Sequence, residues 1–207
     1  MTTTDRFWDR IADKYSRKPV PDEGSYQEKL RITREYLRPD SKVLEVGCGT
    51  GSTALEHAPR VKTVRASDIS ARMIEIAKDK AKAAKIDNVI FEQASIDELD
   101  VAYQSQDVVL ALSILHLVDD RDEALRFLFE TLRPGGVLVS STACLGDHLK
   151  IFKYIGPIGK FLGLMPLVRV FTIAELKESM QRAGFVIERE WLPGKNKGVF
   201  IVAKKPA

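Results

Sequence analysis

One stretch constrains the fold of this chain more than any other, and it reads VLEVGCGTGS over residues 43–52. Its first four residues are mostly branched and apolar, as a buried parallel strand requires. Glycines then alternate at positions 47, 49 and 51, and residues 52–55 can begin a helix. Glycine adopts backbone angles that other residues avoid and lets a ligand approach the main chain. Strand, glycine turn and helix together predict the loop of a nucleotide-like cofactor site.

Two details separate this loop from other glycine-rich loops. A dinucleotide fingerprint spaces its glycines G-x-G-x-x-G, whereas here Gly51 is followed by Ser52 and the spacing is G-x-G-x-G. A phosphate loop ends in Gly-Lys-Ser/Thr, and this loop has no lysine. Glu45, inside the strand, would repel a pyrophosphate but suits a cationic ligand. These features favour a cofactor that carries positive charge and no phosphate.

The pattern E-x-G-x-G-x-G resembles motif I of the class I S-adenosylmethionine-dependent methyltransferases. Their cofactor carries an ammonium and a sulfonium and no phosphate. The resemblance implies an α/β, Rossmann-like fold with a seven-stranded, mostly parallel sheet in the order 3-2-1-4-5-7-6. Strand 7 would be antiparallel, helices would cover both faces, and a helical lid would be added. We expect Glu45 to attract the ammonium of S-adenosyl-L-methionine, through the loop or a water.

Length and composition set broad limits on the protein. A chain of 207 residues with net charge +3 predicts one domain, 1–207, without a strong bias toward nucleic acid. We expect an N-terminal helical cap over 1–39 and an insertion over 144–171. Two distant cysteines, Cys48 and Cys144, predict neither disulfides nor a metal site and favour a reducing, cytoplasmic location. We expect no signal peptide and no membrane-spanning segment.

The segment before the glycine loop, residues 5–38, has apolar residues at helical spacing on both sides of a Pro-Val-Pro break. In the resembled family such helices cover the methionine end of the cofactor and part of the substrate cavity. The resemblance therefore makes Tyr15, Tyr26 and Lys29 candidates for the site. The alternative is that these aromatic residues only pack on the sheet.

A second strand over 62–68 ends in Asp68, and a helix follows with Ser70 as its cap. An acid at this position can accept both hydroxyls of an adenosine ribose. The structural alternative for Asp68 is a turn or cap residue. The resemblance places Ile69 and Met73 beside the adenine, although Met73 would also fit a core position.

A third strand over 88–94 leads into Ala94-Ser95, where the resembled family often has Gly-Asp or Ala-Asp. The Ser95 hydroxyl can still bond the adenine, and Asp97 is either a substitute acid or, as we expect, a helix cap. The resemblance also implies that further residues contact the cofactor: Gly47, Cys48, Gly49, Thr50, Gly51, Ala94, Ile96 and Leu112.

A fourth strand over 106–112 runs into a segment that resembles motif IV of the family and contains His116. Neither Asn/Asp-Pro-Pro-Tyr nor Pro-Cys occurs there, which makes nucleic acid bases poor acceptors. His116 is the candidate catalytic base, because imidazole transfers protons near neutral pH. Alternatively it caps the next helix or packs under a lid. His148 is the second choice.

The second half contains a helix over 119–132, then a turn over 132–136 that resembles the L-K/R-P-G-G turn of the family, and a strand over 137–142. A helix over 172–184 and strands over 185–191 and 198–204 complete the chain. Residues 148–171, which lie between the strand over 137–142 and the helix over 172–184, are apolar and basic. A lid of this kind suits an apolar or amphipathic acceptor, or an encounter with a membrane surface. The alternative is a helical hairpin that packs on the domain.

The function predicted from these features is transfer of a methyl group from S-adenosyl-L-methionine to oxygen or nitrogen of a small molecule. Nucleic acid is not an expected partner. Two alternatives stay open: a nicotinamide-dependent oxidoreductase, and a module that binds the cofactor without transferring methyl. The identity of the acceptor and the oligomeric state do not follow from the sequence.

Overall fold

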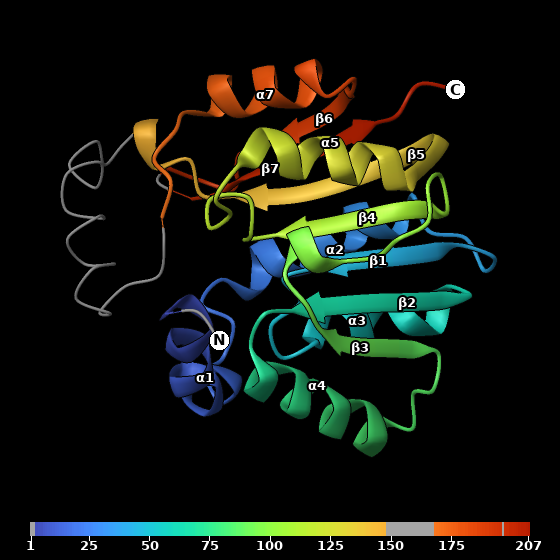
Figure 1. The fold of residues 1–207 in the computed structure, drawn as a ribbon, viewed down its shortest axis with the longest axis vertical. Coiled ribbons are helices and arrows are strands. Elements are labelled where there is room, and N and C mark those ends of the chain that lie inside the picture. Colours follow the sequence, from blue (N-terminus) through green and yellow to red (C-terminus); the bar gives the residue numbers. More distant parts are fainter. Residues whose placement is uncertain (1–2, 148–167, 196) are drawn as a thin grey trace. The chain divides into compact units, whose positions relative to one another are not determined.

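The computed structural model describes residues 3–147, 168–195 and 197–207, which form two compact units, Met1–Asp100 and Val101–Ala207. The strands form a seven-stranded sheet in the order β3-β2-β1-β4-β5-β7-β6 (Figure 1). This order, the antiparallel seventh strand and the helices on both faces confirm the predicted α/β fold. Among the described helices, none is both long and apolar enough to cross a bilayer.

The first unit contains three parallel strands: β1 (Lys42–Val46), β2 (Thr63–Asp68) and β3 (Val89–Gln93). Their registers pair Val46 with Ser67 and Asp68 with Gln93. The carboxyl ends of the three strands therefore meet at one edge, which Figure 1 shows beside α1. In sheets of this class ligands bind outside the carboxyl ends of the strands.

Two helices connect these strands, α3 (Ser52–His57) and α4 (Ala71–Ala84), with the short helix η1 (Ala58–Arg60) after α3. The segment predicted as helical over 5–38 forms α1 (Thr3–Ser16) and α2 (Glu23–Arg34), separated at the Pro-Val-Pro break. The predicted helix is wrong at its end, because α2 stops at Arg34 and residues 35–38 lie outside any helix, with a turn at 35–36.

A cluster of polar contacts fastens α1 to the start of α4. Asp9 Oδ1 accepts hydrogen bonds from the Ser70 hydroxyl (2.6 Å) and the Arg72 backbone N–H (3.1 Å). Arg72 Nη2 also donates to Asp13 Oδ1 at 2.7 Å. Asp9 thus satisfies a backbone donor at the beginning of α4, which would otherwise lack a partner. These contacts hold α1 beside the loops that follow the strands.

The second unit contains β4 (Gln106–Leu112), β5 (Leu132–Thr142), β6 (Val186–Trp191) and β7 (Val199–Lys204). β5 runs parallel to β4, and β7 pairs antiparallel with both β5 and β6. The turn predicted over 132–136 lies inside β5 rather than before it. Leu132 pairs with Gln106 and Val137 with Val108, so the residues between them leave the ladder, with Gly135 at φ 77°.

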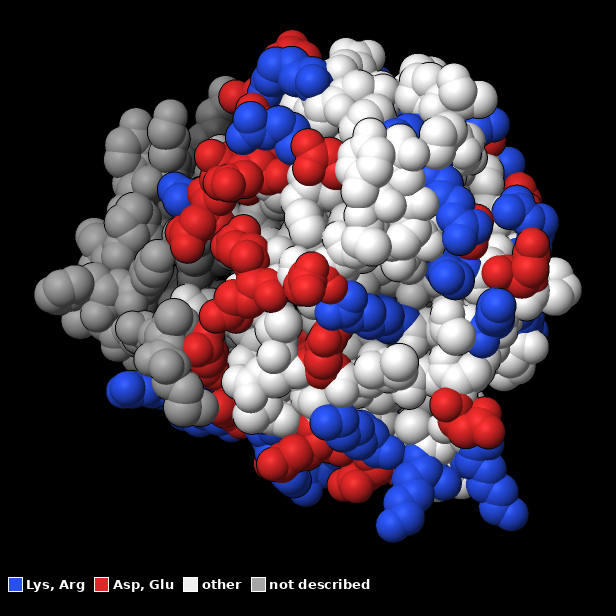
Figure 2. Space-filling view, turned by 45° about the vertical axis from the view of Figure 1, so that its right-hand side comes forward, with Lys and Arg blue, Asp and Glu red and all other residues white. Residues whose placement is uncertain are grey.

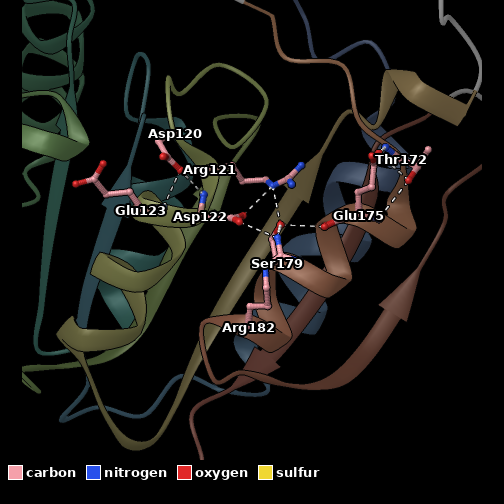
Figure 3. A network of polar contacts seen from close by, with 8 residues as sticks. All are labelled: Asp120, Arg121, Asp122, Glu123, Thr172, Glu175, Ser179 and Arg182. Carbon is pink, nitrogen blue, oxygen red and sulfur yellow. Dashed lines mark hydrogen bonds and ion pairs between the residues drawn. The ribbon is translucent and has the colours of Figure 1, made fainter.

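Helices α5 (Arg121–Thr131) and α7 (Ile173–Arg182) are joined by the polar network in Figure 3. Arg121 Nε donates to Ser179 Oγ at 3.0 Å, and Arg182 Nη2 donates to Asp122 Oδ2 at 2.7 Å. Each helix has its own cap. Asp120 accepts two backbone N–H groups at the start of α5, and Thr172 forms a capping box with Glu175.

The predicted insertion over 144–171 is described only at its two ends. The first end forms the short helix η3 (Leu145–Asp147), and Gly146 N–H donates to the carbonyl of Phe171 at 2.9 Å. Ile173 N–H donates to Asp147 Oδ2, also at 2.9 Å. Residues 148–167, which include His148 and most of the predicted lid, lie outside the described residues.

Candidate cofactor site

The glycine loop between β1 and α3 adopts backbone angles that favour glycine. Gly47, Gly49 and Gly51 have φ values of 68°, 54° and 74°, all in the left-handed region. A Cβ at Gly51 would also lie 2.7 Å from the Phe91 ring and 2.8 Å from Ala77 Cβ. Gly51 is therefore required both by its backbone angle and by the packing of β3 and α4 against the loop.

The carboxylate of Asp68 connects this loop to the one that follows β2. Its Oδ2 accepts the Gly49 N–H at 2.9 Å and its Oδ1 accepts the Ser70 N–H at 2.9 Å. Burial raises the pKa of Asp68, while these two donors act in the opposite direction. Each oxygen keeps a lone pair, so the side chain can still accept hydroxyl donors from a ligand.

Glu45 lies within β1, and its side chain is almost fully buried, with 2% exposed. Among the described residues, none donates a hydrogen bond to its buried Oε2 atom. Burial raises the pKa of Glu45 to about 8, and the charge of Asp68 adds to this effect. Because buried polar atoms are nearly always hydrogen-bonded, the unpartnered oxygen indicates that a ligand or water supplies the donor.

Two tyrosines of the N-terminal helices lie against the loop. A Cβ on Gly49 would lie 3.9 Å from Tyr15 Cε1, although Tyr15 as a whole is 52% exposed. The hydroxyl of Tyr26 lies 3.4 Å from Thr53 Oγ1, at the beginning of α3. Burial raises the pKa of both tyrosines. Both tyrosines therefore lie at the loop and not in the core. Lys29, the third candidate of this segment, is half-buried on α2.

The candidate adenine contacts lie at the ends of β2 and β3. Ala94 N–H donates to the Asp68 carbonyl (3.1 Å), and Gln93 Nε2 donates to the Ile69 carbonyl (3.1 Å). These bonds bring residues 68–69 and 93–94 together. Met73 is buried with 2% exposed, as a core residue would be.

The expected helix cap at Asp97 is wrong. Ser95 caps the short helix η2 (Ile96–Glu98), and its hydroxyl donates to Glu98 Oε2 at 2.9 Å. The backbone N–H of Ser95 donates to the same oxygen. Ser95 can still accept a hydrogen bond from a ligand, but its donors are already used. Ile96, next to it, is buried.

Lys80 is a residue of this site that sequence reasoning missed. From α4, its Nζ donates to Thr50 Oγ1 at 2.8 Å and to Ser52 Oγ at 3.1 Å. Burial lowers the pKa of Lys80. Lys80 lies one helical turn after Ala77, which is near Gly51 in the structure, and this is why its side chain reaches the loop. Lys80 thus contacts the second half of the loop, at Thr50 and Ser52, while Asp68 contacts Gly49.

The candidates of the second unit are Leu112 and His116, at and beyond the carboxyl end of β4. A turn with Ser113 at φ 61° follows the strand. The carbonyl of His116 accepts the Arg169 N–H at 2.8 Å, and its Nδ1 is buried without a partner among the described residues. Burial lowers the pKa of His116 to about 4. The imidazole is therefore unprotonated at neutral pH and able to accept a proton.

Comparison with known proteins assigns the family. Residues 43–136 match the family described as "Methyltransferase domain". The chain is also 38% identical over 117 residues to a 27-O-demethylrifamycin SV methyltransferase of Amycolatopsis mediterranei, a match that covers 56% of this chain and 41% of that protein. The predicted resemblance to the class I S-adenosylmethionine-dependent methyltransferases is thus confirmed over residues 43–136.

The chain is also similar to other methyltransferases, and solved structures share its fold. The chain is 33% identical over 143 residues to the tRNA 5-carboxymethoxyuridine methyltransferase of Escherichia coli (strain K12), covering 65% of this chain and 55% of that protein. It therefore spans about half the length of the curated relatives it matches. The crystal structure of the YcgJ protein of Bacillus subtilis has the same fold, with a TM-score of 0.73 at 16% identity over 87% of this chain and 99% of that one.

The cofactor of this methyltransferase family is S-adenosylmethionine, and the residues of the first unit fit it. The unpartnered Oε2 of Glu45 matches an ammonium donor, and the open lone pairs of Asp68 match ribose hydroxyls. The positive φ angles of the glycine loop allow the main chain to lie against a ligand. None of these three features offers a cation to a pyrophosphate, which disfavours the alternative of a dinucleotide site.

Proposed function

We propose that the protein transfers a methyl group from S-adenosylmethionine to oxygen or nitrogen of a small molecule. The observation that carries this proposal is the buried, unpartnered carboxyl oxygen of Glu45 beside a glycine loop that Asp68 holds in place. An ammonium supplies the positive charge and the N–H donor that this buried acid lacks, whereas a phosphate supplies neither. The same observation opposes the alternative of a nicotinamide-dependent oxidoreductase, whose cofactor carries a pyrophosphate.

When bound, the cofactor supplies an electrophilic methyl group on a sulfonium. We propose that Glu45 binds its ammonium and that Asp68 accepts hydrogen bonds from its ribose hydroxyls. Gly47 to Gly51 would lie against it through their backbone, while Lys80 and Asp68 keep that backbone fixed. Residues 69, 73 and 94–96 would surround the adenine. Tyr15 and Tyr26 would cover the methionine end.

His116 is the proposed base for acceptors that carry a proton on the nucleophile. Its pKa near 4 keeps the imidazole unprotonated at neutral pH, and the same low value limits its strength as a base. This favours acceptors whose own proton is acidic, or acceptors that need orientation more than proton removal. Replacement of His116 by Gln should lower the rate of methyl transfer and leave cofactor affinity unchanged.

A small molecule is the favoured acceptor, and one relative is named for an O-demethylated rifamycin. Another relative is named for a tRNA nucleoside, which makes tRNA the second acceptor to test. Figure 2 shows acidic side chains gathered on the face drawn, with basic ones spread among and around them. Nucleic acid binding depends on basic surfaces, so the face drawn in Figure 2 does not suit tRNA.

The first experiment is calorimetric titration of the protein with S-adenosylmethionine, S-adenosylhomocysteine and NADH. We expect binding of the first two and not of NADH, with binding weakened in Asp68→Ala. A second step uses cofactor labelled on the methyl group with a panel of hydroxy, carboxy and amino compounds and with bulk tRNA. Binding of NADH alone would overturn the proposal. Binding of the cofactor without label transfer to any acceptor class would favour the non-catalytic binding module.

A further inference from the structure

We infer that binding of the cofactor is coupled to ionisation of Glu45, so that one proton is released to solvent for each ligand bound. This inference rests on the proposed function, because it requires that the α-ammonium of S-adenosylmethionine or S-adenosylhomocysteine binds at Glu45. It goes beyond the assignment of a binding residue, since it specifies the charge of that residue before and after binding.

The surroundings of Glu45 explain why it is neutral without ligand. Its side chain is buried in β1, and its Oε2 receives no hydrogen bond from the described residues. The charge that acts on it is the negative charge of Asp68, at the end of β2. Among the described residues, Cys48 in the loop and Tyr26 on α2 also interact with Glu45, whose charge raises the pKa of both. Burial and the Asp68 charge both oppose a carboxylate here, and no described residue donates to Oε2, so the protonated form is favoured.

An ammonium ligand changes this balance. It brings both a positive charge and N–H donors to the unpartnered Oε2, and such charge-assisted bonds are strong where water is excluded. The O–H bond of the Glu45 acid breaks, its proton goes to water, and the carboxylate pairs with the ammonium. The ligand keeps all its own protons. Net release of one proton therefore distinguishes this event from binding to a carboxyl group that was already ionised.

A pH dependence with a defined sign follows. The pKa of Glu45 in the ligand-free protein is about 8, and pairing with an ammonium lowers it in the complex. Between these two values binding releases a proton, so affinity rises with pH by up to about tenfold per pH unit. The buried imidazoles of His57 and His116, each with a pKa of about 4, are already neutral in this range and do not contribute.

The test is calorimetric titration with S-adenosylhomocysteine at pH 6.5 in phosphate and in Tris, two buffers with very different ionisation enthalpies. The difference in observed enthalpy gives the number of protons released. We expect about one proton for the wild-type protein and none for Glu45→Gln. Glu75→Gln, an exposed acid on α4, should still release one proton. A second ligand, 5′-methylthioadenosine, lacks the α-ammonium and should bind to the wild type without proton release.

The outcomes separate this inference from the proposed function. If S-adenosylhomocysteine binds without proton release, or if Glu45→Gln releases as much as the wild type, the inference is wrong and the methyltransferase assignment is unaffected. If neither S-adenosylmethionine nor S-adenosylhomocysteine binds, the proposed function itself fails. Should Glu45→Gln not fold, the comparison of the two ligands on the wild-type protein decides the question alone.

Discussion

Asp68 accepts the backbone N–H of Gly49 at 2.9 Å, which joins the end of β2 to the middle of the glycine loop after β1. The two residues meet because β1 and β2 are adjacent parallel strands, with Val46 paired to Ser67. The Cys48 N–H donates to the Ser67 carbonyl at 2.8 Å and reinforces the junction. The ribose-binding candidate and the loop are thus held in one arrangement before any ligand arrives.

Replacement of Asp68 by Ala tests this junction. The N–H groups of Gly49 and Ser70 lose their acceptor, which we expect to cost about 1–3 kcal/mol of folding free energy. Affinity for S-adenosylmethionine should fall by at least about tenfold, since ribose hydroxyls lose their acceptors too. Chemical unfolding and calorimetric titration measure the two effects. Asp97→Ala, an exposed acid in η2, is the control and should change neither.

Replacement of Gly51 by Ala tests the packing around the loop. The added Cβ would lie within 3 Å of Phe91 and Ala77, and we expect a loss of about 2–4 kcal/mol from overpacking and backbone strain together. Gly135→Ala is a matched control, because Gly135 has nearly the same φ (77°) but nothing within 4 Å of its Cβ position. The difference between the two variants in thermal unfolding isolates the packing contribution. Equal losses would contradict it.

Replacement of Lys80 by Met tests whether the loop is held from α4. Thr50 and Ser52 lose a common donor, so we expect cofactor affinity to fall severalfold while stability changes by less than about 1 kcal/mol. Lys80→Arg keeps the charge and the donors and should recover most of the affinity. Lys78→Met, on the exposed side of the same helix, should behave like the wild type. Unchanged affinity in Lys80→Met would show that the loop holds its conformation without this residue.

Acid should destabilise the protein through His57, which is fully buried on α3 with both ring nitrogens unpartnered among the described residues. Burial lowers its pKa from 6.5 to about 4. The unfolded state then binds more protons between these values, so stability is lost as the pH falls through this window. Linkage gives a loss on the order of 2–3 kcal/mol between pH 7.5 and 4.5. Urea unfolding of wild type and His57→Leu at these pH values should show a smaller loss in the variant.

Much of the fold follows from local sequence patterns. Branched apolar runs predicted every strand to within a residue or two, except for β5, and Thr172 predicted the start of α7. The turn over 132–136 was predicted to precede the strand. It lies inside β5 because the strand pairs with β4 on both sides of the turn, at Leu132 and from Val137 onward. Residues 35–38 continue the helical pattern, but the entry into β1 ends the helix before them.

The site was predicted less completely, because several of its contacts join residues far apart in the chain. Nothing local to Lys80 or Asp9 indicates that one holds Thr50 and the other caps α4. The Ser95 cap is different, since Ser-x-x-Glu is a local capping-box signature and could have been recognised. The sequence shows that Glu45 lies in the strand before the loop. Only the structure shows that its Oε2 atom has no hydrogen-bond donor among the described residues.

The hydrogen bond between Gly146 and Phe171 bears on how the segment between these two residues can change in length and sequence during evolution. The insertion leaves and re-enters the domain at adjacent, hydrogen-bonded positions, and a Cβ at Gly146 would lie 2.7 Å from the Phe171 backbone. A segment with neighbouring ends can be lengthened, shortened or exchanged without moving the strands it connects. We expect the inserted segment to vary in length and sequence among related proteins. Acceptor preference can then diverge while the cofactor-binding residues of the first unit stay the same.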